Sequence, residues 1–260
     1  MNIVVCIKQV PNTNEVKIDP KTGTLIREGV PSIINPDDKA GLEAALRLKD
    51  SQGAHVTVLT MGPPQAETAL REALAMGADE AVLVTDRAFG GADTWATAHT
   101  IAAAVEKLPY DLIITGRQAI DGDTAQVGPQ IAENLNIPNI SYAEEIKVEG
   151  EYVTVKRQFE DRYHILKAKM PCLITALSEL NTPRYMTPGG IVDAYQKEIK
   201  KITRADLDVA DGDIGLKGSP TRVVKTFTKS PKAAGTLVSN LNSQEAADYI
   251  LEKLKEKFII

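Results

Sequence analysis

Residues 111–135 read DLIITGRQAIDGDTAQVGPQIAENL and contain a strand, a polar loop and a helix in immediate succession. The run 111–115 is short and apolar, as expected of a strand buried on both faces of a parallel sheet. Apolar residues recur at helical spacing from Ile131 onward. Because Pro129 fits a helix only in its first turn, this helix is expected to begin near residues 125–128. Strand, loop and helix in this order form the repeating unit of an α/β fold.

The loop of this unit, residues 116–128, has the chemistry of a phosphate-binding turn. The first N–H groups of a helix have no partner within it, and the helix dipole adds positive charge there. Asp121 and Asp123 add acceptors that could bind a ribose hydroxyl or cap the helix. The alternative is an ordinary strand-to-helix turn, in which Gly, Asp and Thr are common for conformational reasons alone. The loop is therefore a candidate nucleotide site.

The first 140 residues repeat this unit. Strands are expected at 3–7, 56–59 and 81–84, and helices between Asn35 and Gly53, between Ala66 and Gly77, and from Asp93 to Leu108. A separate hairpin is expected at 17–27. The alternation predicts an α/β protein with a doubly wound, mostly parallel sheet of the Rossmann-like, nucleotide-binding type. Ligands of such sheets bind beyond the carboxyl ends of the strands. The loops expected there are 8–12, 61–64, 86–93 and 116–128.

The pattern changes beyond Ile140. Residues 146–155 alternate around a glycine turn, which predicts an added antiparallel β-hairpin, and 163–169 and 172–175 look like further strands. From 177 to 235 regular periodicity fades, and Gly and Pro mark extended chain.

We therefore expect an α/β domain at 1–190 and an extended C-terminal arm at 191–260 that ends in a helix. Asn242 and Glu245 have the spacing of a capping box at the start of that helix. The arm carries apolar residues without an evident core, among them Ile199, Ile202 and Leu207. An arm of this kind is expected to lie on another polypeptide.

Charge and cysteine content exclude several classes of protein. The net charge of −5 gives no electrostatic basis for binding nucleic acid or an anionic membrane. Cys6 and Cys172 lie in separate apolar runs, which is typical of small buried hydrophobes rather than of a disulfide framework. Lys8 interrupts the first apolar run, and no run approaches the ~18 residues needed to cross a membrane. A cytoplasmic protein without a signal peptide is expected.

The inventory of catalytic side chains is thin. The three histidines lack metal-ligand spacing, and no Ser–His–acid arrangement is evident. Neither a Walker phosphate loop nor a GxGxxG fingerprint is present. No catalytic residue and no metal site are expected, so any chemistry must come from a cofactor.

Several motifs in register resemble the beta subunit of electron transfer flavoprotein. They occur in order along nearly the whole chain, at 5–11, 35–36, 60–63, 73–79, 116–121 and 181–185. This resemblance implies a heterodimer with an alpha subunit that carries a flavin, and a C-terminal arm that embraces that subunit.

The family divides by what its beta subunit binds. The housekeeping branch holds a structural AMP, whereas the electron-bifurcating branch holds a second FAD, and the loops 86–94 and 121–128 resemble the bifurcating group. That resemblance implies that FAD takes hydride from NADH. One electron would pass through the alpha-subunit flavin to an acyl-CoA dehydrogenase or a lactate dehydrogenase, and the other to ferredoxin or flavodoxin. AMP in the same site remains the alternative.

The resemblance also implies the cofactor-binding residues. They are Cys6, Lys8, Asn35, Asp38, Met61, Phe89, Gly90, Gly91, Asp93, Thr94, Thr97, Asp121, Gly122, Asp123, Thr124, Ala125, Gln126, Val127 and Gly128. Small residues at 90 and 91 would let the backbone approach a flat ring closely. For Asp93 the alternative to a flavin contact is simple capping of the helix that follows it.

The chain departs from the family pattern at a few positions. Asn12 stands where Asp is common, and Arg162 and His164 weaken a family signature in the hairpin region. Residues 187–190 replace a leucine-containing docking loop of the housekeeping branch, which implies a different docking partner. A universal-stress-type nucleotide-binding regulator would share the sheet, but its glycine-rich phosphate loop is missing here.

Overall fold

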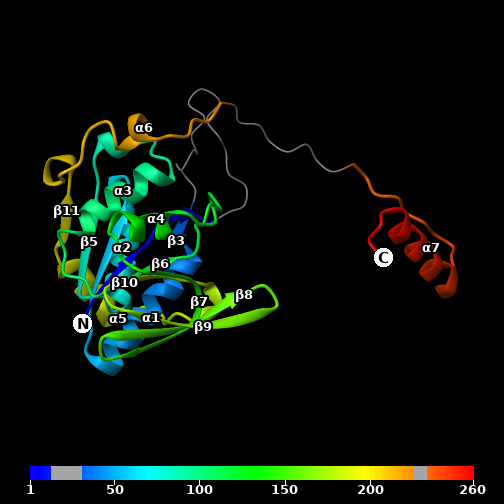
Figure 1. The fold of residues 1–260 in the computed structure, drawn as a ribbon, viewed down its shortest axis with the longest axis horizontal. Helices are drawn as coiled ribbons and strands as arrows, with labels where there is room; N and C mark the ends of the chain where they lie inside the picture. Colours follow the sequence, from blue (N-terminus) through cyan, green and yellow to red (C-terminus); the bar gives the residue numbers. More distant parts are fainter. Residues whose placement is uncertain (13–30, 225–232) are drawn as a thin grey trace. The chain divides into compact units, whose positions relative to one another are not determined.

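The computed structural model describes residues 1–12, 31–224 and 233–260. In these residues a nine-stranded sheet has the order β11-β5-β4-β1-β6-β10-β7-β8-β9, and a two-stranded sheet pairs β2 (Gln9–Pro11) with β3 (Ser32–Ile34) (Figure 1). The hairpin expected at 17–27 lies outside the described residues.

Most strands of the large sheet are parallel. They are β1 (Asn2–Cys6), β4 (His55–Met61), β5 (Glu80–Val84), β6 (Leu112–Gly116), β10 (Cys172–Ala176), β11 (Ile199–Ile202) and the first part of β7 (Asn139–Glu149). The rest of β7 pairs antiparallel with β8 (Tyr152–Phe159), which pairs antiparallel with β9 (Arg162–Lys169). The predicted fold class, with its added hairpin, is confirmed.

The side chains of the central strand β1 belong to two separate hydrophobic cores, one on each face of the sheet. Ile3 and Val5 point into one hydrophobic cluster, and Val4 and Cys6 point into the other. Alternation of this kind shows that both faces of the sheet are covered. It explains why β1 is apolar at every position.

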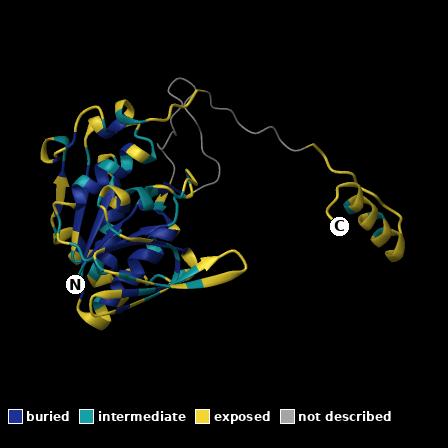
Figure 2. Ribbon diagram, viewed as in Figure 1, coloured by how far each residue is buried: buried dark blue, intermediate teal, exposed yellow. Residues whose placement is uncertain are grey.

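Helices cover both faces. Residues of α1 (Pro36–Gln52) and α2 (Glu67–Met76) belong to the first cluster, and residues of α3 (Thr94–Val105) and α4 (Val127–Asn134) belong to the second. Figure 2 shows the buried strands between these helices, whose outer faces are exposed. The start of α4 at Val127 and the left-handed glycine that ends α1, Gly53, agree with the sequence prediction.

The strand order reverses next to β1. The chain passes from β1 outward to β4 and β5 and then returns to β6 on the other side of β1. The crevice of a doubly wound sheet opens at the carboxyl ends of the two strands that flank this switch point. Here these strands are β1 and β6, and the loop at 116–128 follows β6.

The sequence predicted no regular structure from residue 177 onward, and this prediction is wrong for much of that segment. It contains α5 (Pro188–Gln196), β11, a 3-10 turn at Arg204–Asp206 and α6 (Gly215–Gly218). Ile199 and Ile202 are buried on opposite faces of the sheet, one in each cluster, and Leu207 is buried with Ile202. Two apolar residues three positions apart give no period-two signal, which is why the sequence pattern missed this edge strand.

The chain separates into two compact units, Met1–Val223 and Val224–Ile260. The first unit therefore extends beyond the boundary at residue 190 that the sequence suggested. The second contains α7 (Ser243–Glu256), whose capping box between Asn242 and Glu245 is confirmed. Within the described residues, no helix is long and apolar enough to span a bilayer.

The burial of β11 gives a stability prediction. Ile202→Ala should lower the free energy of unfolding by ~2–5 kcal/mol, because it removes a side chain that is 2% exposed and leaves a cavity. Val224→Ala, at a position that is 97% exposed, is the control and should change it by less than ~0.5 kcal/mol. Denaturant unfolding followed by circular dichroism measures both. Equal stabilities of the two variants would contradict the placement of β11.

Candidate functional site

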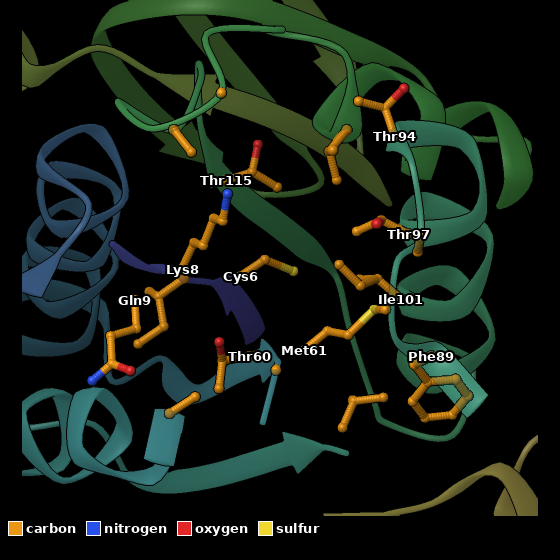
Figure 3. Close-up of a pocket in the computed structure, with 18 of the residues that line it drawn as sticks. Cys6, Lys8, Gln9, Thr60, Met61, Phe89, Thr94, Thr97, Ile101 and Thr115 are labelled. Carbon is orange, nitrogen blue, oxygen red and sulfur yellow. The ribbon is translucent and has the colours of Figure 1, made fainter. Parts of the chain in front are cut away.

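A cavity of about 1170 Å³ lies at the carboxyl ends of β1, β4, β5 and β6. It is lined by the four loops that the sequence places there. Figure 3 shows Lys8 and Cys6 on the side of β1, and Thr94 and Thr97 facing them from α3. Drug-sized ligands fill pockets of roughly 300–1,000 Å³, so this cavity has room for a larger molecule.

The loop after β6 has an unusual backbone. Asp123 and Ala125 adopt left-handed conformations, with φ of 50° and 53°. Alternation of left-handed and right-handed residues turns successive N–H groups toward one side, which forms an anion-binding concavity. We call residues 124–128 the amide cradle.

The amides of the cradle are available to a ligand. Across residues 1–12, 31–224 and 233–260, no protein atom accepts a hydrogen bond from the N–H of any residue from 124 to 128. Gln126, the N-cap of α4, makes no side-chain cap bond. All five residues line the cavity. Free amides at a helix N-terminus fit a phosphate group, as the sequence predicted.

Gly128 has a packing role that the sequence did not predict. A Cβ at this position would lie 2.6 Å from Thr115 Oγ1 and 2.9 Å from Thr175 Cγ2. The glycine therefore lets α4 pack closely on β6 and β10, and its contact with a phosphate stays a prediction. Substitution here would disturb the sheet before it disturbed a ligand.

Asp38 holds the two central strands together at the cavity floor. Its Oδ2 accepts a hydrogen bond from the Lys8 N–H at 2.7 Å, and its Oδ1 accepts one from the Gly116 N–H at 3.0 Å. Burial raises the pKa of Asp38 to about 7, although the hydrogen bonds from Lys8, Asn35 and Gly116 oppose this rise. Gly116 has no Cβ, and an added one would collide with Asp38 Oδ1.

Asn35 and Asp121 shape the cavity without lining it. Asn35 Oδ1 accepts from the Ile120 N–H at 3.0 Å, and its Nδ2 donates to Gln118 O at 2.8 Å. Asn35 therefore fixes the loop after β6 and, although it precedes α1, does not cap that helix with its side chain. Asp121 pairs with Lys8 Nζ at 2.6 Å. Neither Asp121 nor Asp123 caps α4, so that alternative is excluded.

Asp93 is also occupied by protein contacts. Its Oδ1 accepts from the Ala96 N–H and so caps α3, and its Oδ2 accepts two hydrogen bonds from Thr221. Burial alone would raise the pKa of Asp93, but these hydrogen bonds outweigh it and the pKa is lowered. Thr94 Oγ1 donates to Gln126 Oε1 at 2.8 Å. Asp93 therefore caps α3, and because it also lines the cavity, its contact with a flavin stays a prediction.

The remaining wall of the cavity is largely apolar and chemically inert. Met61, Phe89 and Ile101 line it. Burial, followed by the nearby Asp38 carboxylate, raises the pKa of Cys6 to about 12, so its thiol stays protonated at neutral pH. No cluster of His, Cys, Asp and Glu able to hold a metal ion occurs in the described part of the chain.

With the exceptions of Asn35 and Asp121, every cofactor-binding residue expected from the sequence lines the cavity. Sequence reasoning missed other lining residues, including Gln9, Thr60, Arg87, Ile101, Thr115 and Arg117. Thr60 and Thr115 are near the last residues of β4 and β6. Their position at the carboxyl ends of strands was a usable signal, because that edge of the sheet is where ligands bind.

The model of the electron transfer flavoprotein domain matches residues 22–207. The electron transfer flavoprotein subunit beta of Clostridium acetobutylicum is 60% identical to this chain, and the match covers the full length of both. This chain belongs to the electron transfer flavoprotein beta-subunit family. Subunit CarD of the caffeyl-CoA reductase–Etf complex of Acetobacterium woodii is 55% identical, and the acryloyl-CoA reductase electron transfer subunit gamma of Anaerotignum propionicum is 48% identical, each over both full lengths.

The raised pKa of Asp38 predicts a dependence of stability on pH. The unfolded chain releases the Asp38 proton near pH 3.8, while the folded chain holds it up to about pH 7, so ionisation destabilises the fold between these values. Asp38→Asn removes the titration and should itself cost ~1–3 kcal/mol, because one buried N–H loses its acceptor. The difference in unfolding free energy between wild type and variant should therefore shrink as pH rises from 4 to 7. A constant difference would contradict the raised pKa.

The left-handed turn gives a second prediction for this site. A left-handed L-residue costs ~1–2 kcal/mol, so Ala125→Gly should be neutral to stabilising by ~1 kcal/mol after the greater unfolded-state entropy of glycine is allowed for. Ala125→Val should destabilise, because a β-branched residue tolerates positive φ least. Thermal unfolding should rank the proteins glycine, alanine, valine in falling stability. Equal stability of the glycine and valine variants would be inconsistent with the turn.

Proposed function

We propose that this chain is the beta subunit of an electron-bifurcating electron transfer flavoprotein that holds FAD in the cavity. The observation that carries this proposal is the amide cradle beside the switch point of the sheet. When bound, FAD would supply hydride and single-electron chemistry, taking hydride from NADH and sending one electron to ferredoxin or flavodoxin and the other through the alpha-subunit FAD to a dehydrogenase.

In this proposal the residues of the chain bind and orient the cofactor. The cradle amides would hold the diphosphate, because five free donors suit a group with two phosphates. Gly90 and Gly91 have no side chains at the rim of the cavity, so the backbone there leaves room for a ligand. Met61 and Phe89 form an apolar wall against which a flat ring could pack. The volume of about 1170 Å³ favours a dinucleotide over a mononucleotide.

The alternative is AMP, as in the housekeeping branch. One observation supports it: Asp93 and Asp121 already have protein partners, so they add nothing to the recognition of a second nucleotide half. A single phosphate could also use the N-terminus of α4 alone. We favour FAD because the cradle and the cavity are both larger than AMP requires.

A dehydrogenase is proposed to dock beside α5. Arg184 binds the buried Glu43 through its Nε at 2.8 Å, and this pair fixes the segment before α5 on α1. Exposed apolar residues follow: Tyr185, Met186, Ile191, Val192 and Tyr195. The names of two relatives, a caffeyl-CoA and an acryloyl-CoA reductase component, favour an acyl-CoA dehydrogenase over a lactate dehydrogenase as partner. The alpha subunit is proposed to bind the arm, where α7 exposes Ile250 and Leu251.

The proposal predicts the nucleotide content of the complex. The chain, co-purified with its alpha subunit and denatured, should release two FAD per heterodimer. Ala125→Leu should reduce this to about one, because a bulky side chain in the cradle blocks a phosphate.

Gly212→Ala is the control outside the cavity. Gly212 does not line the cavity and a Cβ at this position would have no neighbour within 4 Å, so the variant should keep both flavins. One FAD with one AMP in the wild type would establish the alternative. Two FAD retained in Ala125→Leu would show that the phosphate binds elsewhere.

A further inference from the structure

The segment 214–221 crosses the rim of the cavity at Gly90–Asp93, and we call it the strap. The Leu216 N–H donates to Gly90 O at 3.0 Å, and the Asp93 N–H donates to Ser219 Oγ at 2.8 Å. Thr221 donates to Asp93 Oδ2 twice, from its N–H at 3.0 Å and from its hydroxyl at 2.8 Å. Four hydrogen bonds thus join two segments more than 120 residues apart in the sequence.

Two glycines bring these backbones together. Gly215 has a φ of 57°, and a Cβ there would collide with Ala88 O. A Cβ on Gly91 would lie 3.2 Å from Leu216 Cβ. The approach is therefore closer than side chains would allow, so the strap and the rim are expected to move as one body.

Asp93 links the strap to the amide cradle. Its Oδ2 binds Thr221, its Oδ1 caps α3, and the adjacent Thr94 donates to Gln126 of the cradle at 2.8 Å. Asp93, Thr94 and Gln126 line the cavity, whereas no residue of the strap does. A ligand that orders the cradle can therefore reach the strap through this chain of contacts, and a ligand that touches Gly90 can reach it through the Leu216 hydrogen bond.

The strap is also where the first compact unit ends. That unit runs to Val223, two residues beyond Thr221. The second unit, Val224–Ile260, is called the C-terminal arm from here on, and Thr221 fixes the end of the first unit from which it continues.

We propose that Asp93 is a positioning residue that couples nucleotide binding in the cavity to the strap from which the C-terminal arm departs. The proposal rests on the proposed function only in that the cavity binds a nucleotide, FAD or AMP. Coupling between two sites is reciprocal, so a ligand that fixes the cradle should steady the strap, and a weakened strap should lower nucleotide affinity.

The test uses the complex of this chain with its alpha subunit, depleted of nucleotide and then titrated with FAD. Hydrogen exchange of peptides covering 214–223 should slow at least threefold when FAD saturates the cavity. Thr221→Val removes one of the two bonds to Asp93 Oδ2 and should raise the Kd for FAD by about 3- to 10-fold, the range expected for one hydrogen bond. Ser219→Ala, which breaks the bond from the Asp93 N–H, should act in the same direction.

Thr203→Val is a matched control. Thr203 donates to Asp206 Oδ2 from its N–H at 2.8 Å and from its hydroxyl at 2.7 Å, which repeats the Thr221 arrangement. Neither residue lines the cavity. Thr203→Val should therefore leave the Kd for FAD and the exchange of 214–223 unchanged.

The outcomes are distinct. Binding of FAD with no change in exchange at 214–223, and an unchanged Kd in both strap variants, overturns the coupling and leaves the proposed function standing. An equal loss of affinity in Thr203→Val shows general destabilisation and also overturns it. If the complex binds AMP and not FAD, the FAD assignment fails, and the same measurements with AMP decide the coupling. Failure to bind either nucleotide overturns both proposals.

Discussion

The site depends on a single buried carboxylate, that of Asp38. Its two oxygens accept hydrogen bonds from the backbone N–H groups of Lys8 and Gly116, just beyond β1 and at the end of β6. These strands flank the switch point, so the distance between their ends sets the width of the crevice. Gly116 makes the contact possible because any Cβ would occupy the place of the carboxylate. Strand pairing fixes the spacing of β1 and β6 only as far as Cys6 and Thr115, and Asp38 extends this connection to the loops that follow them, including the loop that forms the cradle.

Most polar side chains around the cavity are used to build it rather than to bind a ligand. Asn35 holds the backbone at Gln118 and Ile120, Asp121 pairs with Lys8, and Asp93 caps α3. A buried polar group must find a partner, and in this chain the partners are other parts of the fold. The groups left for a ligand include lining side chains such as Gln9 and Arg87 and the backbone amides of the cradle, and no side-chain motif in the sequence reveals those amides directly. This explains why the known phosphate-binding fingerprints are absent although the geometry suits a phosphate.

Much of the fold could be predicted from local rules. Continuous apolar runs marked β1 and β6, Gly53 marked the end of α1, and Pro129 placed the start of α4. The edge strand β11 could not be predicted in this way, because Ile199 and Ile202 bury on opposite faces and their flanking lysines are exposed.

In the candidate site too, features set by the local sequence were predictable, whereas contacts between residues far apart in the sequence were not. Residues 122–128 were placed in the cavity because a loop between a strand and a helix has a defined position in a parallel sheet. The contact of Asp93 with Thr221 and the packing of Gly128 on β10 were not predictable. Each depends on a partner that the sequence places far away, Thr221 for the first and Thr175 for the second. Composition and periodicity carry no information about such contacts.

The cradle combines backbone strain with amides that have no acceptor in the described protein. Two residues in left-handed conformations cost ~1–2 kcal/mol each, and five amides have no acceptor in the described protein. The surrounding structure must therefore stabilise this loop by other means, and it does so through Asn35 on one side and the Thr94–Gln126 bond on the other. Thr94 directly follows Asp93, whose Oδ2 binds Thr221 of the strap. The side chain that supports the cradle is therefore covalently adjacent to the residue that holds the strap, and this adjacency is the physical basis of the coupling proposed above.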